Sequence, residues 1–325
     1  MNKLKWGLLS TARINRAVMP PIQLSKRSEL SGVASRDVVK AQAYANDWGL
    51  PRAYGSYEAM LADPDINVVY NPLPNHLHAD WSIKCAEAGK HVLCEKPFAL
   101  SVAEVDRVAA AAQANGVVIA EAFMYKHHPQ TLKVLDLLAQ RAIGDLIAIK
   151  GAFTFMLDRA GDVRWAPDWG GGSIWDVGCY PISFACLIAQ AAPVEVFGWQ
   201  QLGSSGVDVA FAGQLRFANG VVAQIECGFS SPYRTWLEVV GTQGSLYIDK
   251  PFKPTGDVSI SLNYEDRVEI IKVRDQELYQ GEIEDMERAV LDGQPQRIPL
   301  ADSRTVVAVI IALLESARSG QVVRL

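Results

Sequence analysis

The first 120 residues alternate short apolar segments with helix-like segments, and this alternation restricts the fold more than any other feature of the sequence. The expected strands are residues 5–10, 30–35, 68–71, 91–94 and 117–120, and the expected helices are 14–25, 38–48, 77–88 and 102–115. Strands that alternate with helices form βαβ units, in which helices cover both faces of a parallel sheet. We therefore expect residues 1–122 to form an α/β domain with a doubly wound parallel sheet of the Rossmann type.

Beyond about residue 125 the pattern changes. One helix is expected after His128-Pro129, and a long apolar helix over about 174–191 follows three consecutive glycines at 170–172. Strand-like segments then succeed one another without helices, and Asn219-Gly220 between two of them is typical of a β-hairpin. We expect residues 123–325 to form an α+β domain with a large, mostly antiparallel sheet and a last helix near 303–316.

Composition and charge argue against several classes of partner. The net charge is −5 and there is no Lys/Arg-rich run, whereas nucleic-acid binding needs concentrated positive charge. No uninterrupted apolar stretch reaches the ~18 residues of a membrane helix, and the N-terminus lacks a signal-peptide pattern, so we expect a cytoplasmic protein. The cysteines lack zinc spacing, and His127-His128 lacks a third ligand, so we expect reduced thiols and no metal. The cysteines are Cys85, Cys94, Cys179, Cys186 and Cys227.

The turn after the first strand is a candidate pyrophosphate site. A Rossmann fold places G-x-G-x-x-G there, so that backbone N–H groups and a helix N-terminus face the phosphates. This chain has Gly7-x-x-Ser10-x-Ala12, in which small residues still let the backbone approach, and the hydroxyls of Ser10 and Thr11 offer further hydrogen bonds. An ordinary strand–helix turn is the alternative interpretation.

The end of the second strand indicates which dinucleotide would bind. NAD-binding chains place an acid there, which accepts hydrogen bonds from the ribose 2′-hydroxyl. Here Ser35 and Arg36 offer a hydroxyl and a planar cation that suit a 2′-phosphate, while Asp37 stands later and is expected to cap the next helix. The sequence therefore favours NADP over NAD, unless Arg36 is only a solvated surface charge.

Glu95-Lys96-Pro97 follows the strand expected at 91–94. A lysine at the carboxyl end of a parallel strand lies beside the crevice where ligands bind. Its ammonium can donate to a substrate oxygen and stabilise a developing alkoxide, and Glu95 can orient it. The alternative is a surface lysine, the usual fate of this residue type.

Four segments of the chain together resemble one enzyme family. They are the strand and turn that end in Arg13-Ile14 (7–14), the segment from Asn71 to His78, the segment 88–97 around Cys94-Glu95-Lys96-Pro97, and the glycine-led segment 170–181. This set resembles the glucose–fructose oxidoreductase, inositol dehydrogenase and MocA family (Gfo/Idh/MocA). The last segment and the run 121–125 look most like its branch of dimeric dihydrodiol dehydrogenases and NADP-dependent D-xylose 1-dehydrogenases.

The resemblance implies roles for particular residues. It makes Lys96 the catalytic donor and places Asp176 and Tyr180, four residues apart, beside the nicotinamide. Many family members have histidine where Tyr180 stands, so which group gives the proton stays open. Asp176 could instead be an ordinary helix N-terminal acid, Tyr180 a core aromatic, His78 a structural residue, and Arg164-Trp165 a surface loop. The remaining residues expected at the cofactor are Arg13, Ile14, Asn71, Pro72, Leu73, Asn75, His78, Glu95, Lys96, Arg164 and Trp165.

We therefore expect an NADP-dependent oxidoreductase, with a dinucleotide-binding domain over 1–122 and a domain for substrate binding and oligomerisation over 123–325. The implied substrate is a sugar, a polyol or a small diol. The alternatives are a non-catalytic NADP-binding sensor or scaffold of the same fold, and a reductase of a non-sugar carbonyl. Family members often pair through the second domain's sheet, so we expect a homodimer or a higher homo-oligomer.

Overall fold

A computed structural model describes residues 3–325, which divide into two compact units. Unit 1 comprises residues 3–127 and Tyr279–Arg304, and unit 2 comprises His128–Leu278 and Thr305–Leu325. The segment Tyr279–Arg304 therefore belongs with unit 1, although it lies late in the sequence.

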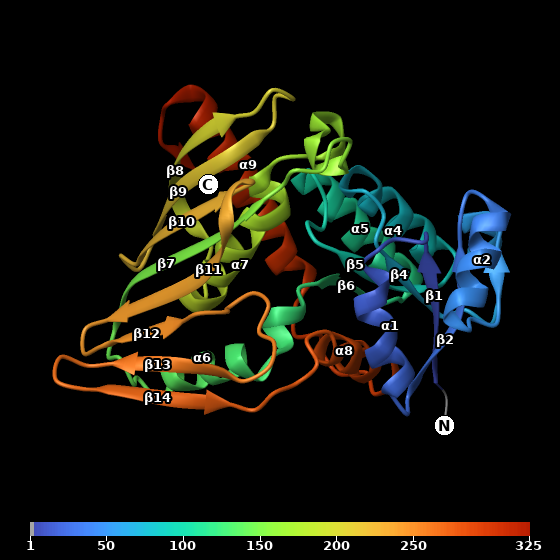
Figure 1. Ribbon diagram of the computed structural model, residues 1–325, viewed down its shortest axis with the longest axis horizontal. Helices are drawn as coiled ribbons and strands as arrows, with labels where there is room; N and C mark the ends of the chain where they lie inside the picture. The colour runs from blue at the N-terminus through green and yellow to red at the C-terminus, as the bar shows by residue number, and fades with distance from the viewer. Residues whose placement is uncertain (1–2) are drawn as a thin grey trace. The chain divides into compact units, whose positions relative to one another are not determined.

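Within the described part of unit 1, six strands form a parallel sheet in the order β3-β2-β1-β4-β5-β6 (Figure 1). The strands are β1 Leu4–Leu9, β2 Ser28–Ala34, β3 Ala53–Tyr54, β4 Val68–Asn71, β5 His91–Glu95 and β6 Ile119–Ala122. From β1 the strand order continues through β2 to β3 on one side and through β4 to β6 on the other. The order therefore reverses between β1 and β4, and such a switch point is where ligands bind in sheets of this kind. The expected doubly wound α/β domain is confirmed.

Capping side chains mark the start of some of the helices in unit 1. The helices are α1 Asn15–Leu24, α2 Val38–Trp48, α3 Tyr57–Leu61, α4 His78–Glu87, α5 Val102–Asn115 and α8 Gln280–Leu291, with short 3₁₀ turns η1 Asn75–Leu77 and η2 Met124–His127. Asp37 caps α2 by accepting the N–H groups of Val39 and Lys40, as expected. Ser101 and Glu104 form a capping box at α5. The elements β3, α3 and α8 were not expected.

In the described part of unit 2, nine strands form one sheet in the order β14-β13-β12-β11-β7-β10-β9-β8-β15. The strands are β7 Leu146–Met156, β8 Pro193–Leu202, β9 Asp208–Phe217, β10 Val222–Gly228, β11 Ser230–Gly241, β12 Ser245–Ile248, β13 Val258–Asn263, β14 Val268–Val273 and β15 Val323–Arg324. Strands β7 and β10 pair in parallel, whereas the other neighbours are antiparallel. The mostly antiparallel sheet is confirmed, as is the β9–β10 hairpin at Asn219-Gly220.

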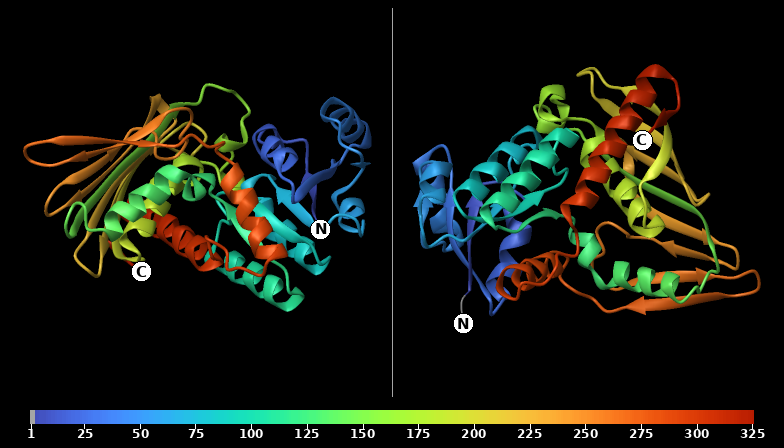
Figure 2. Two further views of the ribbon diagram at one scale, coloured as in Figure 1. Left: turned by 90° about the horizontal axis from the view of Figure 1, so that it is seen from below. Right: turned by 180° about the vertical axis from the view of Figure 1, so that it is seen from behind.

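Helices cover one face of this sheet (Figure 2). They are α6 Pro129–Ala139, α7 Cys179–Ala189 and the part of α9 (Leu300–Ser319) that belongs to unit 2. The segment Pro167–Ala189 is apolar and long enough to cross a membrane by length and composition, but 83% of its most apolar window is buried. It is the core helix of the unit. None of the five cysteines is assigned to a disulfide, and all except Cys186 are buried.

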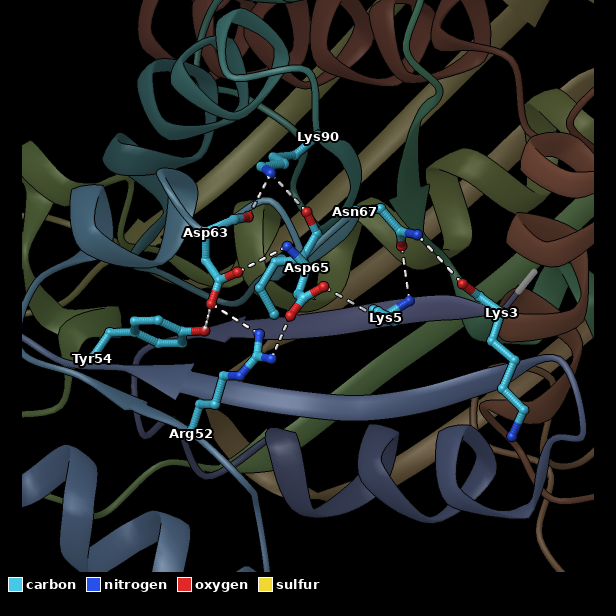
Figure 3. Close-up of polar contacts among 9 residues, drawn as sticks. Lys3, Lys5, Arg52, Tyr54, Asp63, Asp65, Asn67 and Lys90 are labelled. Carbon is cyan, nitrogen blue, oxygen red and sulfur yellow. Dashed lines mark hydrogen bonds and ion pairs between the residues drawn. The ribbon is translucent and has the colours of Figure 1, made fainter.

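A polar network fixes the amino-terminal edge of the unit 1 sheet (Figure 3). Arg52 donates to Asp63 at 2.9 Å and to Asp65 at 2.5 Å, and the Tyr54 hydroxyl also donates to Asp63 at 2.6 Å. The buried ammonium of Lys90 donates to two backbone carbonyls of the same loop, at 2.8 and 2.7 Å. This network holds the loop that leads into β4, at the edge opposite the strands' carboxyl ends.

Candidate functional site

The turn after β1 has the geometry of a phosphate-binding turn. Ser10 has φ +79°, in the left-handed region that glycine favours, and its N–H donates to the Ala34 carbonyl at 2.9 Å. The Asn15 amide donates to the Ser10 carbonyl at 2.9 Å, and no described side chain caps α1. Such backbone strain collects at functional sites. The turn thus leads directly to a helix N-terminus that can face an anion.

Gly7 has a packing role that the sequence did not indicate. A Cβ there would lie 2.7 Å from the Met60 sulfur, so a side chain at this position would require Met60 of α3 to move. Gly7 therefore brings β1 and α3 together.

At the carboxyl end of β2 the acid that follows in sequence, Asp37, is already engaged. The N–H of Ser35 donates to the Tyr54 carbonyl at 3.0 Å, which fixes this strand end. Asp37 caps α2, so its carboxylate serves that helix, while the Arg36 side chain is exposed. Ser35 and Arg36 therefore fit a 2′-phosphate better than a 2′-hydroxyl, which would need a free acid as acceptor.

The loop after β4 is tied down by two buried side chains. The Asn71 amide donates to the carbonyl of His78 at 3.1 Å and to the hydroxyl of Ser82 at 3.3 Å. The His78 ring lies between two carbonyls, with Nδ1 2.8 Å from the oxygen of Pro97 and Nε2 2.6 Å from the oxygen of Leu73. Burial lowers the pKa of His78 to about 4, so the ring is neutral and carries one proton. His78 thus links the loop after β4 to the turn that contains Lys96.

Three further contacts hold the Lys96 turn, whose Lys96–Pro97 peptide bond is cis. The Tyr70 hydroxyl, at the end of β4, donates to Glu95 Oε1 at 2.5 Å, and Glu95 Oε2 accepts the Lys96 N–H at 3.3 Å. Burial and the neighbouring Glu95 raise the pKa of Tyr70 well above 10, so the phenol keeps its proton and remains a donor. Beyond the proline, the N–H of Phe98 donates to Glu121 Oε1 at 3.0 Å. Glu95 therefore orients the backbone of Lys96. Tyr70 and Glu121 were not identified from the sequence as residues that hold this turn.

In unit 2, Asp176 and Tyr180 lie on a helix with an irregular start. Residues Ile174–Gly178 form a π-helical turn, η5, which continues into α7. The expected helix over about 174–191 is confirmed, but it begins with a π turn, whose wider i→i+5 hydrogen bonding shifts the face that side chains share. Such turns are frequent at functional sites.

Asp208 anchors the beginning of that helix. Its carboxylate accepts the Ile174 N–H at 2.8 Å and the Ser173 hydroxyl at 2.5 Å. Gly172 has φ +113°, and a Cβ there would lie 2.2 Å from the Asp208 carboxylate. The glycine before the helix therefore makes room for this carboxylate, and Asp208 is another residue that the sequence did not reveal.

Asp176 is paired with Arg164, which lies in the 3₁₀ turn η3 (Val163–Trp165). Arg164 Nε donates to Asp176 Oδ2 at 2.6 Å, and its NH1 donates to Asp162 Oδ1 at 3.1 Å. These two carboxylates raise the pKa of Arg164 against the effect of burial, so the guanidinium stays charged. From the sequence, Arg164 was expected at the cofactor or in a surface loop, and this pairing was not foreseen. Trp165 packs edge-on against Phe229, with ring centroids 5.7 Å apart.

The Tyr180 ring is held in an aromatic cluster. It is 3% exposed, and its centroid lies 5.3 Å from that of Phe153 and 5.6 Å from that of Phe252. Phe153 and Phe252 stack on each other at 5.6 Å. The body of Tyr180 is therefore a core aromatic, as one interpretation expected, and this packing fixes where its hydroxyl lies.

Comparisons with known proteins agree with this architecture. Residues 4–123 match a family model described as an oxidoreductase family with an NAD-binding Rossmann fold, and residues 131–247 match a GFO/IDH/MocA C-terminal domain. The chain is 38% identical to D-xylose 1-dehydrogenase (NADP(+)) 2 of Haloferax volcanii, over 99% of this chain and 100% of that protein. It is 32% identical to the mouse (Mus musculus) trans-1,2-dihydrobenzene-1,2-diol dehydrogenase, over 78% of this chain and 76% of that protein.

Among solved structures, a similar one is the 3-ketoreductase KijD10 of Actinomadura kijaniata in complex with NADP and TDP-benzene. It has a TM-score of 0.91 and 29% identity, covering 97% of this chain and 98% of that one. The two family models, together with relatives that match along nearly the whole chain, show that this protein belongs to the Gfo/Idh/MocA family of oxidoreductases.

Proposed function

We propose that the chain is a soluble, cytoplasmic, NADP-dependent oxidoreductase that acts on a sugar, a polyol or a small diol or carbonyl compound. The observation that carries the proposal is the Lys96 turn, in which side chains from neighbouring elements hold the residues on both sides of the lysine. Such pre-organisation is what a catalytic donor requires. The chain's likeness to an NADP-dependent D-xylose dehydrogenase supports the cofactor and the substrate class.

The cofactor would be held by the turn after β1 and by the end of β2. The strained turn at Ser10 and the uncapped start of α1 suit a pyrophosphate, and Ser35 with Arg36 suits a 2′-phosphate. Arg13, Ile14 and the loop after β4 would complete the contacts. When bound, the nicotinamide supplies or accepts the hydride.

Lys96, Tyr180 and Asp176 would act on the substrate itself. The Lys96 ammonium donates to the substrate oxygen and stabilises negative charge on it, and Lys96 and Tyr180 together give or take its proton. Asp176, held by Arg164 at 2.6 Å, accepts a hydrogen bond from a substrate hydroxyl. The KijD10 structures include one form with a lysine replaced by alanine and one with a tyrosine replaced by phenylalanine, the two residue types proposed here.

A turnover screen tests the proposal. NADPH and NADP⁺ would be offered with aldoses, trans-diols and diketones, and consumption or formation of NADPH followed by absorbance. Lys96→Ala is expected to abolish turnover while NADPH affinity stays within a few-fold of the unsubstituted chain. Retained activity would remove Lys96 from the mechanism. Tight NADPH binding without turnover of any substrate would instead favour the sensor.

Cofactor choice has its own test. Arg36→Ala is expected to weaken NADPH binding about 10- to 100-fold, because a charge-assisted hydrogen bond is lost, and to leave NADH binding little changed. Fluorescence titration measures both. Equal losses for the two cofactors would contradict the 2′-phosphate assignment.

We also propose that the chain pairs through the outer face of the unit 2 sheet, which α6, α7 and α9 do not cover (Figure 2). A row of residues crosses β8, β9, β10, β7 and β11 on this face, and it runs Trp199, Ala212, Glu226, Ala152 and Trp236. Trp199 is 58% exposed, and large exposed apolar side chains of this kind mark interfaces. Light scattering should show a homodimer or a larger assembly that Trp199→Glu weakens. A monomeric unsubstituted chain would refute the pairing.

A further inference from the structure

Glu121 lies at the carboxyl end of β6 and is a buried acid that the proposed chemistry does not use. It is 2% exposed, and its Oε1 accepts the N–H of Phe98 at 3.0 Å. Phe98 stands two residues after Lys96, and Pro97 between them has no N–H to donate. The Phe98 N–H is therefore the first backbone donor beyond the lysine by which this turn can be held.

We propose that Glu121 is a positioning residue that fixes the pose of Lys96 by holding the following turn through the Phe98 N–H. The inference rests on the proposed function, in which Lys96 is the catalytic donor. A second anchor acts one residue earlier, where the Pro97 carbonyl lies 2.8 Å from the His78 ring. Two consecutive residues after Lys96 are thus held, one from β6 and one from α4.

A carboxylate serves this purpose better than a neutral acceptor. Charge-assisted hydrogen bonds are shorter and roughly twice as strong as neutral ones. A buried carboxylate also needs compensation, and unit 1 supplies part of it. Lys126 of η2 and the Ser303 hydroxyl of α9 both favour the charged form, as does the Phe98 N–H. The Lys126 side chain is only 4% exposed and its ammonium lies 4.0 Å from Asp302.

The charge state of Glu121 is expected to change near neutral pH. Burial, and to a smaller extent Glu95 of β5, oppose ionisation, and together with the groups from η2 and α9 they leave the pKa of Glu121 raised to about 7. The carboxylate holds the turn above this pH. Below it, the protonated group keeps an acceptor oxygen but loses the charge that strengthens the bond.

Glu121→Gln tests the inference, because glutamine has the shape of the protonated acid at every pH. We expect kcat at about pH 8.5 to fall about tenfold, the loss of one charge-assisted contact, with the NADPH dissociation constant changed by no more than a few-fold. In the unsubstituted chain, kcat should fall between about pH 8 and pH 6 as Glu121 becomes protonated, and in Glu121→Gln this fall should be absent. An unchanged kcat, or a pH profile that keeps this limb, would overturn the inference. Glu104→Gln is the matched control, since Glu104 accepts backbone N–H groups of Leu100 and Ser101 further along the same loop.

A second measurement does not depend on turnover. Hydrogen exchange at the Phe98 amide, followed without cofactor, should be about tenfold faster in Glu121→Gln than in the unsubstituted chain at about pH 8.5. Equal protection in both chains would overturn the inference even if the enzyme is active. Faster exchange in a chain that turns over no substrate would keep the contact between Glu121 and the turn but refute the proposed function.

Discussion

Replacement of Glu121 by glutamine is predicted to stabilise unit 1 at alkaline pH and to have little effect at acidic pH. The folded-state pKa of Glu121 is raised by burial from 4.5 to about 7. Below pH 4.5 the carboxyl is protonated in both the folded and the unfolded chain, so its ionisation costs no stability there. As the pH rises through the interval up to about 7, the unfolded chain loses the proton first, and the free energy of unfolding falls.

The size of the effect follows from this difference in pKa. A rise of 2.5 (7 − 4.5) at ~1.4 kcal/mol for each pKa unit gives a cost of about 3 kcal/mol that is fully present above pH 7. Glutamine is neutral at every pH and avoids this cost. For a domain of this size about 3 kcal/mol corresponds to a change in Tm of roughly 6–12 °C.

Scanning calorimetry of both chains between about pH 4 and pH 8.5 measures the difference in Tm, and the titration of the other groups cancels in that difference. We expect the difference to grow from near zero to the range above, while kcat of the variant falls. A loss of activity that accompanies a gain in stability could not arise from general unfolding. A difference in Tm that is independent of pH would refute the reasoning, because it would mean that Lys126 and the Phe98 N–H fully compensate the buried charge.

Two further predictions concern unit 2. Gly172→Ala places a Cβ 2.2 Å from the Asp208 carboxylate at φ +113°, so chemical unfolding should show a loss of about 2–4 kcal/mol. Gly161→Ala, at φ +73° with no described atom within 4 Å of the new Cβ, should lose only about 1 kcal/mol, and equal losses would exclude the Asp208 contact as the cause. Arg164→Met removes the 2.6 Å partner of the largely buried Asp176 and should cost about 1–3 kcal/mol, since the arginine is 37% exposed. Adding Asp176→Asn should restore part of that stability, and a double variant no more stable than Arg164→Met would argue against the pairing.

The sequence predicts most of the fold of unit 1, because most of its strands and helices are long enough to show their own period, whereas β3 and α3, with 2 and 5 residues, are too short. Helices α2 and α5 agree with expectation at both ends, since capping residues mark them. In contrast, β7 was not expected, although it lies within the sheet of unit 2. Its outward residues include Ala148 and Ala152, and its inward residues include Gly151, where a Cβ would lie 3.0 Å from Leu237. Small residues on both faces remove the polar–apolar alternation by which a strand is recognised.

The candidate site is predictable only in part, for a related reason. Lys96 stands at a strand end within a distinctive motif, and Asp176 and Tyr180 stand in another, so local sequence is enough to propose them. The residues that hold them are distant in sequence. Glu121 contacts a backbone N–H 23 positions away, and Asp208 contacts one 34 positions away. Only the topology of the two sheets brings these pairs together.

The two turns that carry the proposed catalytic residues are each held by a buried carboxylate that accepts a backbone N–H. In unit 1 a buried acid accepts the N–H of Phe98 beyond Lys96, and in unit 2 a buried acid accepts the N–H of Ile174 before Asp176. Burial raises the pKa of both Glu121 and Asp208, so acidification weakens both anchors in the same direction. If each acts only through its own turn, the reductions in kcat caused by Glu121→Gln and Asp208→Asn should multiply in the double variant. A double variant no slower than the poorer single variant would mean that the two turns move together, and that the rate depends on one shared rearrangement instead of two separate poses.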